Sequence, residues 1–419
     1  MKKFRIGILG TGRGSNIAKN LMQFNECDIV AMCDSNTDRL KIGIERLGNE
    51  IAVYNSFDEF IEHGLDAVVI ANNFHQHTPY ILKCFENNIH VFCECISNST
   101  MAEGVELIRA FEKSKSIFFL GENYPQMLSG REIKRVCDSN TLGKLLYAEG
   151  EYNHPYDISL STDESIKFIK DFIYSASHWR NYLPRSYYIT HSLGPLMHAT
   201  GATPKTVTAF AAFAPPPEDY PAISKVGDKV AIVTTQNDDG SIFRITGTAA
   251  FGAHHTSYRV CGTKGQIESL RGMEDKIMLR YNAWDVPEGM NEVNLYTPEI
   301  NDKDEDKIKE SGHGGSDYLT ARMFVDCLKE NKQPDHPFNI YSSVNMSSVA
   351  ILAHRSILEG GKPYEIPDFR KEEDRIKYEN DSLTPFIGEN GEEPTLPCCS
   401  HTDYKPTDEQ IARYMALLK

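Results

Sequence analysis

Short apolar runs alternate with amphipathic stretches over the first third of the chain. Strands are expected at about residues 4–9, 29–33, 65–71, 89–93 and 117–120, with helical patterns between them. Continuous apolar strands are typical of parallel sheets whose two faces are both covered by helices. The alternation therefore predicts an α/β fold that begins with a doubly wound domain over about residues 1–122.

Beyond residue 122 the pattern becomes mostly strand-like. Strands are expected near 145–152, 206–212, 230–235, 242–249 and 257–261, with helices near 126–138, 318–329 and 345–359. The last two helices carry apolar stripes and are expected to pack on the sheet. The segments 153–187 and 285–314 are expected to be long loops, which in compact domains are usually functional or mobile. We assign residues 123–366 to this second, substrate-binding and oligomerisation domain.

Residues 367–419 are predicted to form an extended acidic tail with a short terminal helix. Glycine and proline residues interrupt any regular pattern before position 398. Thr407 and Gln410 then have the spacing of a capping box, and Ile411, Tyr414 and Leu418 fall on one helix face. That face requires a partner, either on this chain or on a neighbouring one.

Composition excludes several classes of function. The 44 Lys and Arg against 59 Asp and Glu give a net charge of -15, which repels nucleic acid and anionic lipid. No apolar run is long enough to span a bilayer, and the first residues do not resemble a signal peptide, so a cytoplasmic protein is expected. The ten cysteines are scattered and are expected to be reduced thiols. Neither they nor the histidines have the spacing of metal ligands, so no metal is expected.

A glycine motif follows the first strand and opens the first helix. It reads Gly10-Thr11-Gly12-Arg13-Gly14-Ser15, with Ser15 where a third glycine usually stands. Gly10 permits the tight turn, and Gly12 lets the backbone approach a pyrophosphate at the helix N-terminus. Arg13 either contacts that pyrophosphate or lies solvated on the turn.

The second strand ends in an acidic residue that selects the cofactor. Asp34 lies 20 residues beyond Gly14. A carboxylate at this place binds both ribose hydroxyls of NAD and repels the 2′-phosphate of NADP. Together with the glycine motif, Asp34 predicts a Rossmann domain that binds NAD.

Further segments at the ends of the strands expected at 65–71 and 89–93 make the chain resemble the Gfo/Idh/MocA family of sugar and cyclitol oxidoreductases. These segments are residues 71–77, with Asn72 and His77, and residues 91–96, with Glu94. The resemblance implies that these three residues join the cofactor site. It also implies a second α/β domain with a large, open, mainly antiparallel sheet, a homo-dimer or homo-tetramer, and a carbohydrate or polyol substrate between the domains.

Two proton-handling positions of that family are changed in this chain. The family motif Glu-Lys-Pro is here Glu94-Cys95-Ile96, and a neutral thiol cannot supply the charge or the three donors of an ammonium group. In a second motif, Tyr187 stands where the family has Asp, whereas His191 is retained four residues later. His191 can accept the alcohol proton as hydride leaves.

Several stretches are similar to one branch of the family, the NAD-dependent glycoside hydrolases acting on α-N-acetylgalactosaminides. The stretches are residues 121–124, 147–154, 179–180, 188–191 and 312–318. Enzymes of that branch oxidise the sugar at C3 with a retained NAD, eliminate the aglycone, add water and return the hydride. By this resemblance Tyr188 and His191 lie beside the reacting face, and Tyr152 takes the C2 proton.

Four more residues are candidates for binding the substrate. Arg180 can hold a substrate oxygen, or alternatively form a structural ion pair, and Trp179 offers an aromatic face to a sugar. His313 lies in a glycine-flanked loop before a helix, and Tyr124 lies in one of the stretches named above.

Three functions remain open on the sequence alone. The first is an oxidoreductase that begins redox-neutral glycoside cleavage by oxidation and elimination. The second is a net sugar or cyclitol dehydrogenase that releases NADH. The third is a non-catalytic protein that binds NAD and a sugar.

Overall fold

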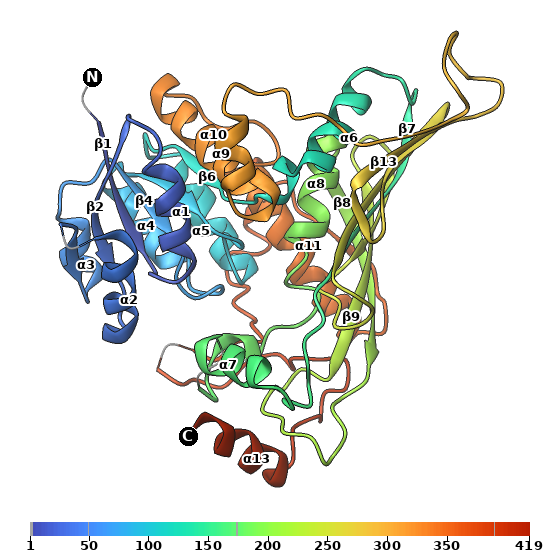
Figure 1. The fold of residues 1–419 in the computed structure, drawn as a ribbon. Helices are drawn as coiled ribbons and strands as arrows, with labels where there is room; N and C mark the ends of the chain where they lie inside the picture. The colour runs from blue at the N-terminus through green and yellow to red at the C-terminus, as the bar shows by residue number, and fades with distance from the viewer. Residues whose placement is uncertain (1–2, 49, 173–174, 389) are drawn as a thin grey trace.

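The computed structural model describes residues 3–48, 50–172, 175–388 and 390–419, which form two lobes with separate sheets (Figure 1). The N-terminal lobe lies on the left of the view, and the larger sheet lies on the right. Helices α8 and α11 lie between them. Within the described residues no helix combines the length and apolarity needed to cross a membrane.

The first sheet is six-stranded and parallel, in the order β3-β2-β1-β4-β5-β6. Helices cover both faces, so the predicted doubly wound fold is confirmed. The strands are β1 (Phe4–Leu9), β2 (Cys27–Cys33), β3 (Ala52–Tyr54), β4 (Ala67–Ile70), β5 (His90–Cys93) and β6 (Phe118–Leu120). The helices are α1 (Arg13–Leu21) and α2 (Thr37–Leu47) in one apolar cluster, with α3 (Phe57–Ile61), α4 (Thr78–Glu86) and α5 (Met101–Phe111) in another.

The second sheet has nine strands in the order β14-β13-β12-β11-β7-β10-β9-β8-β15. All neighbours are antiparallel except β7 and β10, which confirms the expected mainly antiparallel sheet. The pattern did not reveal the strands from β12 onward. The strands are β7 (Leu145–Asn153), β8 (Pro204–Phe213), β9 (Asp228–Asn237), β10 (Ile242–Thr246), β11 (His255–Gly262), β12 (Gly265–Leu270), β13 (Met273–Tyr281), β14 (Val293–Tyr296) and β15 (Tyr364–Glu365).

Three helices cover the inner face of this sheet: α6 (Leu128–Asp138), α8 (Thr190–Thr200) and α11 (Ile340–Leu358). Helix α10 (Ser316–Glu330) was expected to pack there too, and that expectation was wrong. It packs instead on α1, and Phe324 contacts Phe92 and Phe119 of the first sheet at ring-centroid distances of 5.4 and 5.7 Å. The apolar stripe of α10 therefore completes the core of the N-terminal lobe.

The outer face of the second sheet remains open to solvent. Phe210 and Ile232 are paired across β8 and β9 and are 62% and 36% exposed, while Ile242 on β10 is 45% exposed. The predicted homo-dimer or homo-tetramer remains a prediction.

The two segments expected to be loops contain regular elements. Residues 153–187 include α7 (Asp163–Phe172) and the 3-10 turn η2 (Trp179–Asn181). Residues 285–314 include β14 and α9 (Glu305–Glu310), and they run into η3 (His313–Gly315). The remaining short elements are η1 (Tyr124–Gln126) and α12 (Glu372–Arg375).

The C-terminal segment packs closely on both lobes. Phe386 is 1% exposed, stacks on His75 at 4.7 Å and meets Tyr187 edge-on at 5.3 Å. Helix α13 (Asp408–Leu418) has both hydrogen bonds of the capping box. Its Tyr414 packs with Ile169 of α7 in a small apolar cluster, so the terminal helix docks on its own chain.

Phe386 anchors the C-terminal segment, and its removal tests that packing. We expect Phe386→Ala to lower the free energy of unfolding by about 3 kcal/mol, because a buried phenylalanine leaves a cavity when truncated. Urea denaturation followed by circular dichroism measures the change. Leu383→Ala is the matched control in the same segment, since Leu383 is 42% exposed. Equal stability of the two variants would contradict the packing described.

Candidate active site

The glycine turn has the features of a dinucleotide site. Gly10 has φ +87°, and a Cβ there would lie 2.3 Å from the carbonyl oxygen of Ala71, so only glycine fits. Helix α1 begins at Arg13 with Gly12 as its N-cap, with no side-chain cap and no acidic residue in the first turn. Gly14 lies in that first turn, and the Ser15 hydroxyl donates to the Thr11 carbonyl at 2.6 Å. The first-turn N–H groups are therefore available to a pyrophosphate.

Asp34 lies at the carboxyl end of β2, as expected for the ribose end of the cofactor. Its Oδ2 accepts hydrogen bonds from the backbone N–H and the hydroxyl of Thr11, each at 3.0 Å. Asn72, at the end of β4, has a buried Oδ1 with no hydrogen-bond partner among the described residues. A buried acceptor of this kind takes a hydrogen bond from a ligand or from an ordered water. His77 is 2% exposed, and its Nδ1 lies 2.6 Å from the carbonyl oxygen of Ile96.

Glu94 and Cys95 follow β5 on the same edge. Glu94 accepts a hydrogen bond from Arg13 Nε at 2.9 Å. The thiol of Cys95 donates to Glu122 Oε2 at 3.2 Å. Burial raises the pKa of the Cys95 thiol, and the nearby carboxylates of Glu122 and Glu94 raise it further, so the thiol is neutral.

The centre of the site is a buried pair of His191 and Glu122. His191 lies in the first turn of α8 and is 8% exposed, and Glu122 follows β6 and is 0% exposed. His191 Nδ1 lies 2.9 and 3.0 Å from the two carboxylate oxygens, while Nε2 lies 3.2 Å from the hydroxyl of Tyr188. When the ring carries one proton and Nδ1–H donates it to the carboxylate, Nε2 is an acceptor; when the ring carries two protons, both nitrogens are donors.

The surroundings of Glu122 keep its carboxylate ionised. Burial raises the pKa of Glu122, but the charge and hydrogen bond of His191 lower it by more, so the pKa lies below its ordinary value. The backbone N–H of Tyr124 donates to Oε1 at 3.1 Å. Gly194 of α8 leaves room for the side chain, because a Cβ there would lie 2.8 Å from Glu122 Cγ.

Three tyrosines surround His191. Tyr124 stacks on its ring at 4.1 Å, while Tyr152 at 5.0 Å and Tyr188 at 5.1 Å meet it edge-on. Burial raises the pKa of all three phenols, so they are neutral donors at neutral pH. For Tyr152 the hydrogen bond with Tyr124 and the charge of Arg180 oppose that rise.

Trp179 and Arg180 form a wall beside Tyr188. Phe74 stacks on Trp179 at 5.1 Å and lies 5.6 Å from Tyr188. The Arg180 guanidinium lies 4.4 Å from the Trp179 ring centroid. In the part of the chain that the structure describes, no carboxylate lies within ion-pair distance of Arg180. The alternative of a structural ion pair therefore has no partner here.

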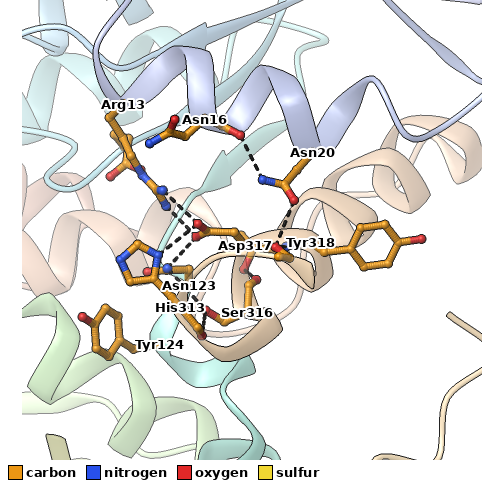
Figure 2. A network of polar contacts seen from close by, with 12 residues as sticks. Arg13, Asn16, Asn20, Asn123, Tyr124, His313, Ser316, Asp317 and Tyr318 are labelled. Atoms are coloured by element: carbon orange, nitrogen blue, oxygen red, sulfur yellow. Dashed lines mark hydrogen bonds and ion pairs between the residues drawn. The ribbon is translucent and has the colours of Figure 1, made fainter. Parts of the chain in front are cut away.

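Arg13 and His313 meet at Asp317, as Figure 2 shows. The Arg13 guanidinium donates to both oxygens of Asp317 at 3.0 and 2.7 Å, so the side chain is paired rather than solvated. His313 Nδ1 lies 3.0 Å from Asp317 Oδ2, and the His313 side chain is 45% exposed. The His313 ring lies 6.0 Å from that of Tyr124.

The site thus gathers the candidates named from the sequence and adds Glu122 and Asp317, which sequence reasoning missed. Glu122 follows a buried strand at the carboxyl edge of the sheet, the same signal that identified Glu94. Asp317 lies in a motif already noted, but its partner Arg13 is 304 residues away in sequence. Tyr187 points elsewhere, since its hydroxyl donates to the Ser99 carbonyl at 3.3 Å. All ten cysteines are free, as expected.

Two family models match the chain. Residues 4–122 match the oxidoreductase family with an NAD-binding Rossmann fold. Residues 132–375 match the C-terminal domain of glycosyl hydrolase 109. The second match covers more than half of the chain.

Individual proteins agree with these models. A glycosyl hydrolase family 109 protein of Stenotrophomonas maltophilia is 22% identical over 413 residues, covering 88% of this chain and 89% of that protein. A levoglucosan dehydrogenase crystallised with NADH and L-sorbose has a TM-score of 0.70 at 13% identity, over 88% of this chain and 100% of that one. A myo-inositol 2-dehydrogenase of Lactobacillus plantarum has a TM-score of 0.65 at 19% identity, over 87% and 100%.

The similar solved structures show the fold, and the family models show to which family the chain belongs. The site fits the cofactor named by the first model, since the glycine turn, Asp34 and the unpaired Asn72 oxygen all lie on one sheet edge. The chain therefore belongs to the Gfo/Idh/MocA family of NAD-dependent oxidoreductases, in the branch that carries the glycosyl hydrolase 109 C-terminal domain.

Proposed function

We propose that this enzyme cleaves a glycoside by oxidation and elimination, with no net change in redox state. Bound NAD supplies an acceptor for the sugar hydride and a store from which that hydride is returned. The chain's own residues then have three tasks, which are to take the hydroxyl proton, to manage the C2 proton and to hold the sugar.

The arrangement of His191 carries this proposal. Glu122 holds Nδ1, so Nε2 is the basic atom and lies beside the Tyr188 hydroxyl. A base oriented in this way by a buried carboxylate can take the proton of a secondary hydroxyl during its oxidation. The retained His191 also argues against the third alternative, a non-catalytic protein.

Tyr152 and Arg180 support the elimination step. Oxidation at C3 acidifies the proton at C2, and its removal expels the aglycone and leaves a double bond. Water then adds across that bond. Tyr152 packs against both Tyr124 and His191. Burial raises the pKa of its phenol, and the charge of Arg180 offsets only part of that rise, so the proton at C2 must pass to Tyr152 against a raised pKa. Arg180 and Trp179, which lie beside Tyr188, hold the sugar.

A net dehydrogenase is the second candidate, because solved relatives with this fold include levoglucosan and myo-inositol dehydrogenases. The thiol at Cys95 disfavours it. A buried neutral thiol cannot supply the ammonium group found at this position in the dehydrogenases that the sequence resembles.

Isotope incorporation distinguishes the two reactions. We expect aryl α-N-acetylgalactosaminide, or another aryl glycoside of a panel, to release its aglycone in D₂O and to yield a free sugar with one deuterium at C2. NADH should not accumulate, because the hydride is returned. Absorbance at 340 nm and mass spectrometry measure both quantities. If free sugars instead yield stoichiometric NADH while the glycosides stay intact, the enzyme is a net dehydrogenase.

Substitution of the buried pair tests the proton relay. His191→Ala should lower kcat by about a thousandfold or more, because the base is removed. Glu122→Gln should lower kcat by about a hundredfold, because the carboxylate no longer holds the imidazole ring in one orientation. NAD affinity, measured by calorimetry, should change little in either variant. Full turnover by His191→Ala would remove this residue from the mechanism.

Replacement of Asp34 tests the cofactor end of the site. Asp34→Ala should weaken NAD binding and reduce the preference for NAD over NADP, since the carboxylate that binds the ribose and repels a 2′-phosphate is gone. Titration with each nucleotide checks both effects. An unchanged preference would place the ribose elsewhere.

A further inference from the structure

Asp317 is a nearly buried carboxylate whose contacts join separate parts of the site. It lies in the first turn of α10, and its side chain is 7% exposed. Figure 2 shows the contacts that it makes with Arg13, Asn123 and His313. The Asn123 amide donates to Oδ1 at 2.7 Å, alongside the two bonds from the Arg13 guanidinium.

These partners come from both sides of the candidate active site. Arg13 follows Gly12 in the cofactor turn, whereas Asn123 follows Glu122, the partner of His191. His313 precedes α10 and faces Tyr124. One carboxylate of the C-terminal half therefore links the cofactor turn to the substrate side.

The Arg13 side chain also bridges the carboxyl edge of the first sheet. Its Nε donates to Glu94 at 2.9 Å, and Glu94 directly follows β5. In the sheet, β4 lies between β1 and β5. Arg13 thus connects the turn after β1 with the end of β5, along the edge where dinucleotides bind in such sheets.

We propose that Asp317 is a positioning residue for the cofactor: it holds Arg13 across this edge as a clasp that opens before NAD can leave. One guanidinium serves two carboxylates, Glu94 and Asp317, and only Asp317 comes from the C-terminal half. Loss of Asp317 leaves Arg13 held by the N-terminal lobe alone. Slow cofactor release suits an enzyme that returns its hydride in place.

The charge balance supports a closed clasp at neutral pH. Burial raises the pKa of Asp317, but the hydrogen bonds and charges of His313 and Arg13 lower it by more, so the carboxylate is ionised. Asp317 and Arg13 are therefore oppositely charged at neutral pH, and the two hydrogen bonds between them are charge-assisted.

A second ion pair on the same helix provides the control. At the C-terminal end of α10, Lys329 Nζ lies 3.0 Å from Glu26 Oε1 of the N-terminal lobe. Lys329→Ala removes an ion pair between α10 and the same lobe without touching the glycine turn. Any general loosening of α10 would appear in this variant too.

The release of NADH measures the clasp directly and needs no sugar substrate, so its outcome is independent of the proposed function. Full-length enzyme is loaded with NADH and mixed with excess NAD, and the loss of bound-NADH fluorescence is followed by stopped flow. We expect Asp317→Asn and Arg13→Lys to release NADH about tenfold faster or more, because lysine lacks the planar fork that serves two carboxylates. Lys329→Ala should match the parent rate, and Asp317→Glu should restore most of the retention.

Two results would overturn the proposal. One is an unchanged release rate in Arg13→Lys, which decides the matter even if Asp317→Asn does not fold by circular dichroism. The other is equal acceleration in Lys329→Ala, which would assign the effect to the anchoring of α10 rather than to the clasp.

Discussion

The need to stabilise one buried charge organises this molecule. Glu122 is 0% exposed, and an isolated carboxylate in such a place would be protonated or would destabilise the fold. The Glu122 carboxylate is hydrogen-bonded by His191, by the backbone N–H of Tyr124 and by the thiol of Cys95. These groups come from α8, from the start of η1 and from the end of β5, so the charge is stable only when the two lobes are packed together. The geometry of the candidate site thus depends on the packing of the two lobes.

Five of the six strands of the N-terminal lobe were predictable because their signals are local, whereas the three-residue edge strand β3 was not expected. Apolar runs as short as Ala67–Ile70 are buried on both sides and need no knowledge of their neighbours. Strands β12 and β13 escaped prediction because they carry charged residues such as Glu268 and Lys276 and lie toward one end of an open sheet. The stripe of α10 indicated that one face is buried, but periodicity does not tell which element covers it. The partner of Phe324 is Phe92, which lies in the N-terminal lobe.

Some residues of the candidate site were recognisable from short motifs, and others only from long-range contacts. His191 and Asp34 were recognised from short motifs, whereas Glu122 and Asp317 act through partners 69 and 304 residues away. Such contacts depend on how the lobes pack and not on any spacing along the chain. A carboxylate directly after a buried parallel strand is nevertheless a useful signal, because that edge is where ligands of open α/β sheets bind. Both Glu94 and Glu122 occupy such places.

The thiol at Cys95 changes the charge balance without removing acid–base chemistry. An ammonium group at this position would place a cation next to Glu122 and compete with His191 for its oxygens. The neutral thiol instead donates one weak hydrogen bond and leaves the carboxylate paired with the imidazole. His191 then has two short contacts with Glu122, and its Nε2 lies beside the Tyr188 hydroxyl. With no lysine at this position, the proposed reaction leaves the hydroxyl proton to His191, which must both remove it and return it.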